Sequence, residues 1–184
     1  MARSVRLDRA RTVVLVVDVQ ERLCPAMPPG DLARLVKYTK ALLGAARALE
    51  LPVLATEQYP KGLGHTLPEL RELLPPPLQK LHFSCGADPG FAAALAATGR
   101  RQVVMAGMET HVCVFQTARD LAEAGYEVFV CADAVASRTD EHRQVGLTLC
   151  HEAGATVTTA ETAIFDLLHQ CATPEFKAVA PLVR

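Results

Sequence analysis

The chain has 184 residues, half of them hydrophobic, and carries 19 basic and 20 acidic side chains for a net charge of −1. This balance, without charge runs, gives no reason to expect nucleic acid or an anionic membrane surface as a partner. The apolar run Val13–Val17 is far too short to span a bilayer, and no apolar signal-peptide core follows the arginines of residues 1–11. We therefore expect a cytoplasmic protein with one domain, residues 1–184.

The first half of the chain predicts two buried strands separated by a helix. Thr12–Val17 is a nearly unbroken β-branched run, which is typical of a strand buried on both faces. Asp31–Leu49 has apolar residues at helical spacing, and Pro52–Thr56 reads as a second short strand. Residues 57–79 contain two glycines and five prolines, which predict a long irregular loop.

The second half alternates between strands and helices. The predicted strands are Gln102–Ala106, Glu127–Ala132 and Thr156–Thr159. The predicted helices are Phe91–Ala97, His111–Ala124, Asp140–Ala153, Ala163–Cys171 and Glu175–Val183. This alternation predicts an α/β fold with a doubly wound, mostly parallel sheet and helices on both faces. The active site of such a sheet lies beyond the carboxyl ends of its strands.

Asp18 is the first candidate for chemistry. It follows the apolar run Val13–Val17 at the carboxyl end of the first predicted strand. A carboxylate at this place is partly desolvated, and burial raises its affinity for a proton, which suits a general base. The same carboxylate could instead cap the segment that follows, and its position alone does not separate the two roles.

Cys113 is the second candidate, in the segment Gly107–Cys113 that joins a strand to a helix. Thr110 is the expected N-cap, which puts Cys113 in the first helical turn. There the helix dipole and free backbone N–H groups stabilise a thiolate and can hold a developing oxyanion. The alternative is a buried structural cysteine, the interpretation that suits Cys131 and Cys150 within their apolar segments.

Lys80 is the third candidate. It follows three prolines and lies near the apolar residues Leu78 and Leu81. A lysine against apolar walls needs its charge compensated by a carboxylate such as Asp18. The alternative is an ordinary solvated lysine on the surface.

Other motifs are incomplete. The six cysteines are widely and irregularly spaced without a Cys-x-x-Cys pair, which favours free thiols in a reducing compartment over disulfides or a zinc ribbon. His151-Glu152 lacks the second histidine of a zincin motif, and Gly62-Leu63-Gly64 lacks the third glycine of a dinucleotide loop. A protease-like pairing of the cysteine with His82, His142 or His151 is not favoured by the spacing. The sequence therefore predicts no metal and no other cofactor.

Together, these segments resemble the isochorismatase-like cysteine hydrolases over nearly the whole chain. Val14–Gln20 resembles the family's first strand with its acid–base aspartate, and Lys80–Ser84 resembles its lysine segment. Ala106–Val114 resembles the turn that carries the nucleophile, and this match is the most specific of the three. Later family landmarks match Asp133-Ala134, Ser137-Arg138 and Glu161.

The resemblance implies that Asp18, Lys80 and Cys113 are catalytic. Asp18 takes the thiol proton, Lys80 stabilises the charges, and Cys113 attacks a carbonyl to form a thioester that water releases. The family places a non-proline cis peptide in this turn, which maps to Met108–Glu109 and implies an oxyanion hole made by the N–H groups of Glu109 and Cys113. The substrate pocket is expected to be largely apolar and to take a small, largely neutral molecule. Its expected residues are Leu23, Tyr59, Phe83, Met108 and His111.

Two departures from the family pattern narrow the expected reaction. Nicotinamidases of the family carry an Asp-x-His metal motif after the second strand, where this chain reads Glu57-Gln58-Tyr59, so we expect no catalytic metal. Isochorismatases proper do not use the cysteine, so Cys113 favours hydrolysis of an amide or ureido C–N bond. Thr56–Pro60 is most similar to the isochorismatase-domain-containing branch, whose substrates are poorly defined.

Two alternatives remain. The first is isochorismatase-type hydrolysis of a vinyl ether, which would use Asp18 and Lys80 but tolerate loss of Cys113. The second is a non-catalytic scaffold or binding subunit with the same fold. The family also implies a homo-oligomer.

Overall fold

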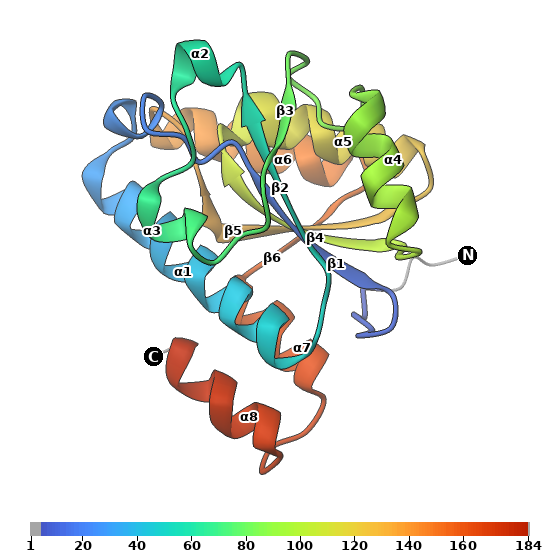
Figure 1. Ribbon diagram of the computed structural model, residues 1–184. Helices are drawn as coiled ribbons and strands as arrows, with labels where there is room; N and C mark the ends of the chain where they lie inside the picture. The colour runs from blue at the N-terminus through green and yellow to red at the C-terminus, as the bar shows by residue number, and fades with distance from the viewer. Residues whose placement is uncertain (1–4, 184) are drawn as a thin grey trace.

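Six parallel strands form one sheet, in the order β3-β2-β1-β4-β5-β6, in the computed structural model, which describes residues 5–183 (Figure 1). The strands are β1 (Thr12–Val17), β2 (Val53–Gln58), β3 (Leu78–Lys80), β4 (Gln102–Met108), β5 (Glu127–Ala136) and β6 (Thr156–Thr158). The predicted α/β class with a mostly parallel sheet is confirmed.

Helices cover both faces of this sheet (Figure 1). One face packs against α1 (Pro29–Ala48), α7 (Ala160–Leu168) and α8 (Pro174–Val179). The other face packs against α4 (Pro89–Ala97), α5 (Phe115–Glu123) and α6 (Asp140–Glu152). The shorter elements are α2 (Pro60–Leu63), α3 (Pro68–Arg71), the 3-10 turns Cys24–Ala26 and Ala180–Val183, and the π turn Thr110–Val114.

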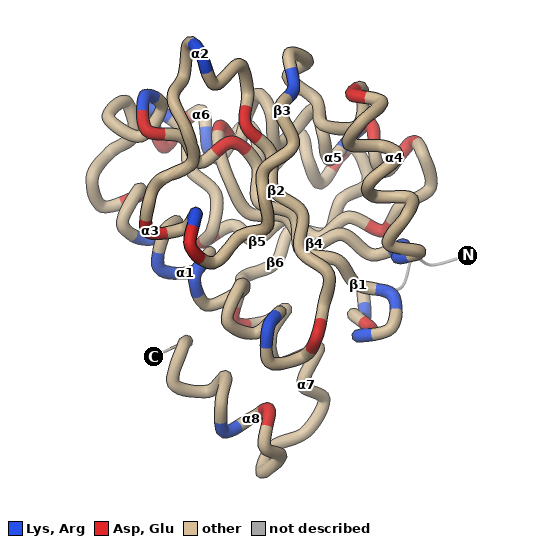
Figure 2. The backbone as a smooth tube through the Cα atoms, in the orientation of Figure 1, with Lys and Arg blue, Asp and Glu red and all other residues tan. Residues whose placement is uncertain are grey.

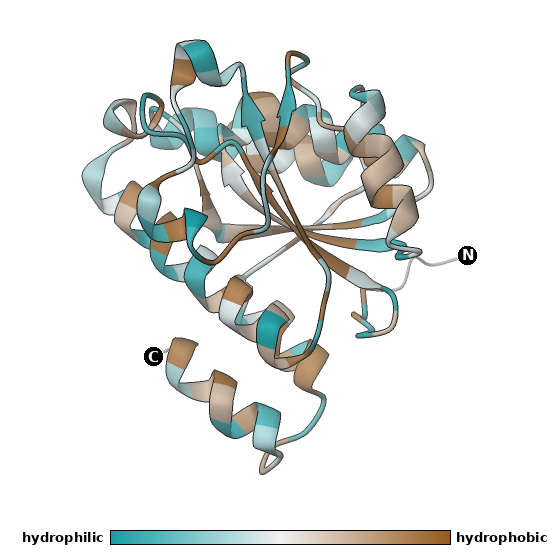
Figure 3. Ribbon diagram, in the orientation of Figure 1, coloured by the Kyte–Doolittle hydropathy of each residue, from teal (hydrophilic) through white to brown (hydrophobic). Residues whose placement is uncertain are grey.

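The apolar run of β1 explains why helices cover both faces of the sheet. Val13, Leu15 and Val17 pack in the core with α4, α5 and α6, whereas Val14 packs with α1, α7 and α8. Successive side chains of a strand point to opposite faces, so a strand without polar residues needs cover on both. Figure 3 shows the hydrophobic stretches meeting in the centre of the sheet.

Residues 57–79 are more regular than the predicted loop. β2 continues to Gln58 because it pairs with β3, in the register Thr56↔Leu78, Glu57↔Gln79 and Gln58↔Lys80. Two short helices begin at Pro60 and Pro68, and proline suits a first helical position because it has no N–H to leave unpaired. Two of the five prolines that predicted a loop therefore begin helices, whereas the three at 75–77 lie in no helix or strand.

The segment after β4 is also different from the prediction. The predicted helix over 111–124 divides into the π turn Thr110–Val114 and α5. The predicted cap was wrong, because Thr110 is the first residue of the turn and its buried hydroxyl makes no hydrogen bond within the described residues. β5 runs on past the predicted end at Ala132 to Ala136 through an irregularity in its pairing with β4.

The strand order places its point of reversal at the carboxyl ends of β1 and β4. β1 lies between β2 and β4, and the chain leaves β1 toward α1 on one face but leaves β4 toward α5 on the other. Ligands bind at such a reversal point in open α/β sheets. Asp18 follows β1 and Cys113 follows β4, so both lie at this point.

Gly107 allows the two strands to meet there. Its φ is +135°, and a Cβ atom on it would lie 2.1 Å from the carbonyl oxygen of Val17. No side chain fits at that distance, so a glycine is required beside the residue that precedes Asp18.

Within residues 5–183, no helix is both long enough and apolar enough to cross a membrane.

Candidate functional site

Asp18 and Lys80 form a buried ion pair. The Nζ atom of Lys80 donates to Oδ2 of Asp18 at 2.6 Å, and both side chains are 0% exposed. The backbone of Asp18 has a φ of +50°, in the left-handed region that side chains rarely adopt and that is often kept at functional sites. The two residues are 62 positions apart in the chain, and the parallel strands β1 and β3 bring them together across β2.

Lys80 is held by four oxygen atoms in all. Besides Asp18, its Nζ atom lies 2.8 Å from Oε1 of Gln58, 3.1 Å from the carbonyl oxygen of His82 and 3.0 Å from that of Phe83. Burial alone would lower the pKa of Lys80, but the negative charge of Asp18 outweighs it and raises that pKa. The ammonium is therefore charged and fixed in place at neutral pH.

Cys113 completes the cluster from the π turn. Its thiol lies close enough to the Asp18 carboxylate to be influenced by it, and the residue is buried, at 7% exposed. Burial and the Asp18 carboxylate raise the pKa of Cys113, while Lys80 acts in the opposite direction. The prediction that the helix start alone would favour a thiolate is corrected here, because desolvation in the folded chain is the stronger effect. The resting side chain is a neutral thiol.

Three residues that the sequence analysis did not single out line this cluster. Thr56 donates its hydroxyl to Oδ1 of Asp18 at 2.7 Å, and Gln58 accepts from Lys80. Cys85 is a second thiol, 0% exposed, with Sγ 3.6 Å from the Thr56 hydroxyl oxygen. Polar residues at the end of a buried strand, as in Thr56 and Gln58, are the signal that could have identified two of them.

The turn that carries Cys113 is supported from several sides. The peptide bond between Met108 and Glu109 is cis. The carbonyl oxygen of Glu109 accepts from the N–H groups of Val112 at 3.1 Å and Val114 at 3.2 Å, on either side of Cys113. The Glu109 carboxylate accepts from Arg138 at 2.9 Å. These contacts close the turn on itself and tie it to the end of β5.

Helix α6 reaches this turn through Gly146, which gives a testable prediction. A Cβ atom on Gly146 would lie 2.7 Å from the backbone N of His111 and 2.7 Å from the carbonyl carbon of Thr110. We expect Gly146→Ala to push the turn away, to lower the free energy of unfolding by about 1–3 kcal/mol and to slow the reaction of Cys113 with alkylating agents. Urea unfolding and the alkylation rate measure the two effects.

Gly30→Ala is the matched control for this prediction. Gly30 lies in the first turn of α1, and a Cβ atom there meets nothing within 4 Å. Alanine should therefore be neutral or slightly stabilising at this position. If the two variants unfolded alike and reacted alike, α6 would have no part in placing the turn.

The five predicted pocket residues lie in different surroundings. Tyr59 lines a cavity of about 430 Å³, whose other lining residues are Pro60, Lys61, Gln79, Lys80, Leu81, His82 and Asp88. Met108 is fully buried, in a core cluster against which Leu23 packs, and Phe83 is 55% exposed. Nδ1 of His111 is hydrogen-bonded to the Ser137 hydroxyl oxygen at 3.0 Å, and the His111 ring stacks on the ring of His142. Lys80 alone belongs to both the cavity wall and the ion pair.

In the stretch that stands in place of the Asp-x-His motif, the Glu57 carboxylate makes hydrogen bonds that hold the neighbouring loop. Oε1 of Glu57 accepts from the N–H of Thr66 at 2.7 Å and from its hydroxyl at 2.9 Å, and Oε2 lies 3.1 Å from Nδ1 of His65. Burial would raise the pKa of Glu57, but these hydrogen bonds outweigh it and lower that pKa. Across residues 5–183, no group of three or more His, Cys, Asp or Glu side chains could hold a metal ion.

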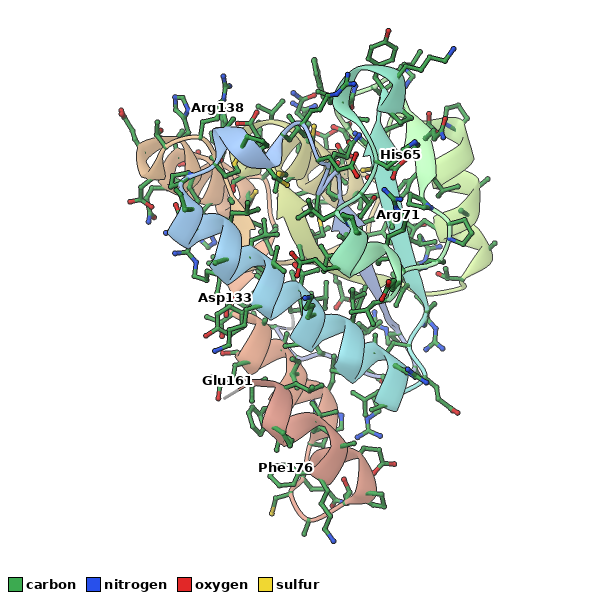
Figure 4. The ribbon with its side chains drawn as sticks, turned by 60° about the vertical axis from the view of Figure 1, so that its left-hand side comes forward. His65, Arg71, Asp133, Arg138, Glu161 and Phe176 are labelled. Atoms are coloured by element: carbon green, nitrogen blue, oxygen red, sulfur yellow. The ribbon has the colours of Figure 1, made fainter. Side chains whose placement is uncertain are left out.

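The residues that match later family landmarks lie in different parts of the molecule. Figure 4 shows Arg138 and His65 toward one end of the molecule and Asp133 and Glu161 farther down, beside α1 and α7. Oδ1 of Asp133 accepts from the N–H of Ala160, the first residue of α7, at 2.8 Å. Asp133 therefore holds a helix in place, whereas Arg138 supports the turn of Cys113.

Comparisons with known proteins agree with this architecture. A family model described as the isochorismatase domain matches residues 12–162. Isochorismatase domain-containing protein 2 of Danio rerio is 34% identical, and the match covers 100% of this chain and 92% of that protein. Isochorismatase domain-containing protein 1 of Danio rerio is 39% identical over 97% of this chain, but the chain spans only 62% of its length.

Solved structures show the same fold. A ribonuclease from Caenorhabditis elegans, named MAR1, is 36% identical with a TM-score of 0.89, covering 97% of this chain and 92% of the other. YcaC from Escherichia coli, an octameric hydrolase of unknown specificity, is 28% identical with a TM-score of 0.89 and coverages of 99% and 91%. YcaC from Pseudomonas aeruginosa, with hexane-2,5-diol and covalent acrylamide, is 27% identical with a TM-score of 0.88 and coverages of 99% and 93%.

Proposed function

Because the chain belongs to the isochorismatase family, we propose that it is a hydrolase of a small-molecule amide or ureido C–N bond, with Cys113 as nucleophile and Asp18 and Lys80 as its acid–base partners. The observation that carries the proposal is the buried cluster in which Cys113 lies beside the Asp18 carboxylate while Lys80 holds the same carboxylate at 2.6 Å. A nucleophile, a base and a group that orients the base are the parts that covalent catalysis needs.

The charges of the cluster explain how a thiol with a raised pKa can react at neutral pH. Loss of the Cys113 proton to solvent would leave two anions beside one ammonium in a buried site, and this is costly. Transfer of the same proton to Asp18 leaves one anion and one ammonium, as before. Since the net charge does not change, the thiolate forms inside the cluster without a new desolvation penalty, and the three groups titrate as a unit.

The proposed reaction has two halves. Asp18 takes the thiol proton, and the Cys113 sulfur attacks the carbonyl carbon. The tetrahedral intermediate then breaks its C–N bond while protonated Asp18 gives its proton to the leaving nitrogen. In the second half Asp18 takes a proton from water, the resulting hydroxide attacks the thioester, and the C–S bond breaks. The thiolate recovers the proton from Asp18, and the free acid leaves.

The turn supplies the proposed oxyanion hole. The N–H groups of Glu109 and Cys113 are the expected donors to the developing oxyanion. The turn is closed by its own hydrogen bonds to the Glu109 carbonyl and fixed by Arg138, so such donors are held rigid before substrate arrives. Preorganised backbone donors are often the largest single contribution to acyl-transfer catalysis.

A small, largely neutral substrate suits the surroundings. Cys113 is 7% exposed and the side chains of Asp18 and Lys80 are 0% exposed, so only a small reactive group can reach the sulfur. The covalent acrylamide in the Pseudomonas aeruginosa structure is itself a small neutral amide that reacts with nucleophiles. It supports a nucleophile of this kind in the family and provides a probe for this chain.

Nucleic acid is not the proposed substrate, although the Caenorhabditis elegans relative is named a ribonuclease. The net charge of this chain is −1, and Figure 2 shows basic and acidic residues interspersed along the chain. Binding to a phosphate backbone needs clustered positive charge. A vinyl-ether substrate and a non-catalytic role stay as the alternatives to the amide.

We also propose a homo-oligomer in the cytoplasm. The octameric Escherichia coli relative supports the assembly, because oligomers of such folds are built from repeated copies of one chain. The six cysteines, all free, five of them buried, suit a reducing compartment.

Capture of the thioester tests the proposal. We expect a panel of small amides and ureido compounds to include one that yields its free acid, with an acid-quenched acyl adduct on the Cys113 peptide detected by mass spectrometry. Turnover that leaves no adduct, and that continues at full rate after Cys113 has been alkylated, would exclude a covalent cysteine mechanism.

A further inference from the structure

The Asp18 carboxylate is held at both oxygen atoms. Oδ2 accepts from Lys80 at 2.6 Å, and Oδ1 accepts from the Thr56 hydroxyl at 2.7 Å. Thr56 lies on β2, directly beside the end of β1, and is 1% exposed. A carboxylate that is fixed at both oxygens cannot rotate, so the orientation from which it reaches the Cys113 thiol is set by these two partners.

Cys85 supports the hydroxyl from behind. The single proton of Thr56 is donated to Asp18, so the contact of 3.6 Å between Cys85 and the Thr56 oxygen needs the thiol proton as its donor. Full burial raises the pKa of Cys85 to about 11, which keeps that proton in place. The N–H of Cys85 donates to the hydroxyl of Thr117 on α5 at 2.9 Å, which fixes its position.

We propose that Thr56 is a positioning residue for the reaction at Cys113, and that the hydrogen-bond relay Cys85–Thr56–Asp18 keeps the Asp18 carboxylate aimed at the Cys113 thiol. This inference rests on the proposed function. It also assigns different roles to the two thiols of the site: Cys85 is a permanent hydrogen-bond donor, and Cys113 is the one whose proton moves. The titratable groups that face the carboxylate are Lys80, Cys85 and Cys113.

The test is the rate at which acrylamide alkylates Cys113 between about pH 4 and 10 in the full chain. Thr56→Val keeps the side-chain shape but removes the hydroxyl. Because a hydrogen bond to a charged group is strong, we expect its loss to move the acid limb of the rate profile to higher pH by about one pH unit. We also expect the neutral-pH rate to fall about tenfold, because a carboxylate that is free to rotate meets the thiol in fewer productive orientations. Thr56→Ser should restore both the limb and the rate.

Thr39→Val is the matched control, because Thr39 is a fully buried threonine in α1 whose hydroxyl makes no hydrogen bond within the described residues. It should leave the profile unchanged. Cys85→Ser retains a donor and should resemble the wild type, whereas Cys85→Ala should shift the limb in the same direction as Thr56→Val. Thermal unfolding of each variant separates a changed profile from a lost fold.

Two results would overturn the relay. In one, the Thr56→Val profile superimposes on that of the wild type. In the other, Thr56→Val and Thr56→Ser lose rate equally without a shift of the limb, which would show a packing role alone. Either result, with Asp18→Asn still inactive, rejects the relay but keeps the proposed function. An Asp18→Asn variant that alkylates like the wild type rejects the proposed function itself.

Discussion

Cys113→Ala is expected to lower amide hydrolysis about a thousandfold or more, because a covalent mechanism has no route without its nucleophile. The fold should survive, since the change removes only the sulfur atom from one buried side chain. Steady-state release of the free acid measures the effect.

Cys171→Ala is the control for that variant. Cys171 is the exposed thiol among the six cysteines and lies outside the cluster, so its loss should leave the rate unchanged. Persistence of hydrolysis in Cys113→Ala would argue for a reaction that needs only Asp18 and Lys80, as expected of a vinyl-ether hydrolase. That outcome would replace the proposed substrate class.

The Asp18–Lys80 pair should show the largest effect on stability. Lys80→Met leaves a buried carboxylate without its cation, and Asp18→Asn leaves a buried ammonium without its anion. Removing one partner of a buried pair costs about 3–5 kcal/mol, whereas removing both charges costs much less. We therefore expect each single variant to lose about that much free energy of unfolding, and the double variant to recover a substantial part of it.

Urea unfolding of the four proteins measures this cycle. Lys40→Met is the matched control, because the ion pair of Lys40 with Glu69 is exposed and such pairs contribute about 1 kcal/mol or less. Since the pKa of Lys80 is raised in the folded chain, its contribution is present throughout the neutral range and is lost only as the pH rises through that value. Strictly additive losses in the double variant would contradict a coupled pair.

The sequence was sufficient for the elements whose patterns are local. The β-branched run predicted β1 with its bounds, and the alternation of strands and helices predicted the parallel sheet. Asp18 was found because it follows a buried strand directly, and Cys113 because it lies in the segment that joins a strand to a helix. Lys80 was proposed as a partner of Asp18 from its apolar neighbours, and the structure brings the two side chains into contact.

Features that depend on packing between distant segments were not predictable in the same way. Thr56 and Gln58 contact Asp18 and Lys80 only because β2 lies between β1 and β3, and no local pattern states that order. The direction in which the pKa of Cys113 moves depends on how deeply the turn is buried, and burial is a tertiary property. Which residues line the cavity beside Lys80 is a tertiary property as well, and of the five predicted pocket residues Tyr59 is in that lining.

In the proposed mechanism, Cys113 loses its proton to Asp18 within the cluster of Asp18, Lys80 and Cys113, whose net charge stays zero. The most direct test follows the alkylation of Cys113 by acrylamide against pH, with mass spectrometry to separate it from the other five cysteines. Internal proton transfer predicts a rate that is level across neutral pH in the wild type. It also predicts that Asp18→Asn abolishes this plateau and leaves a rate that climbs only with pH. A wild-type rate that rises about tenfold per pH unit through neutrality, and is the same in Asp18→Asn, would mean that Cys113 ionises on its own and that Asp18 is not its base.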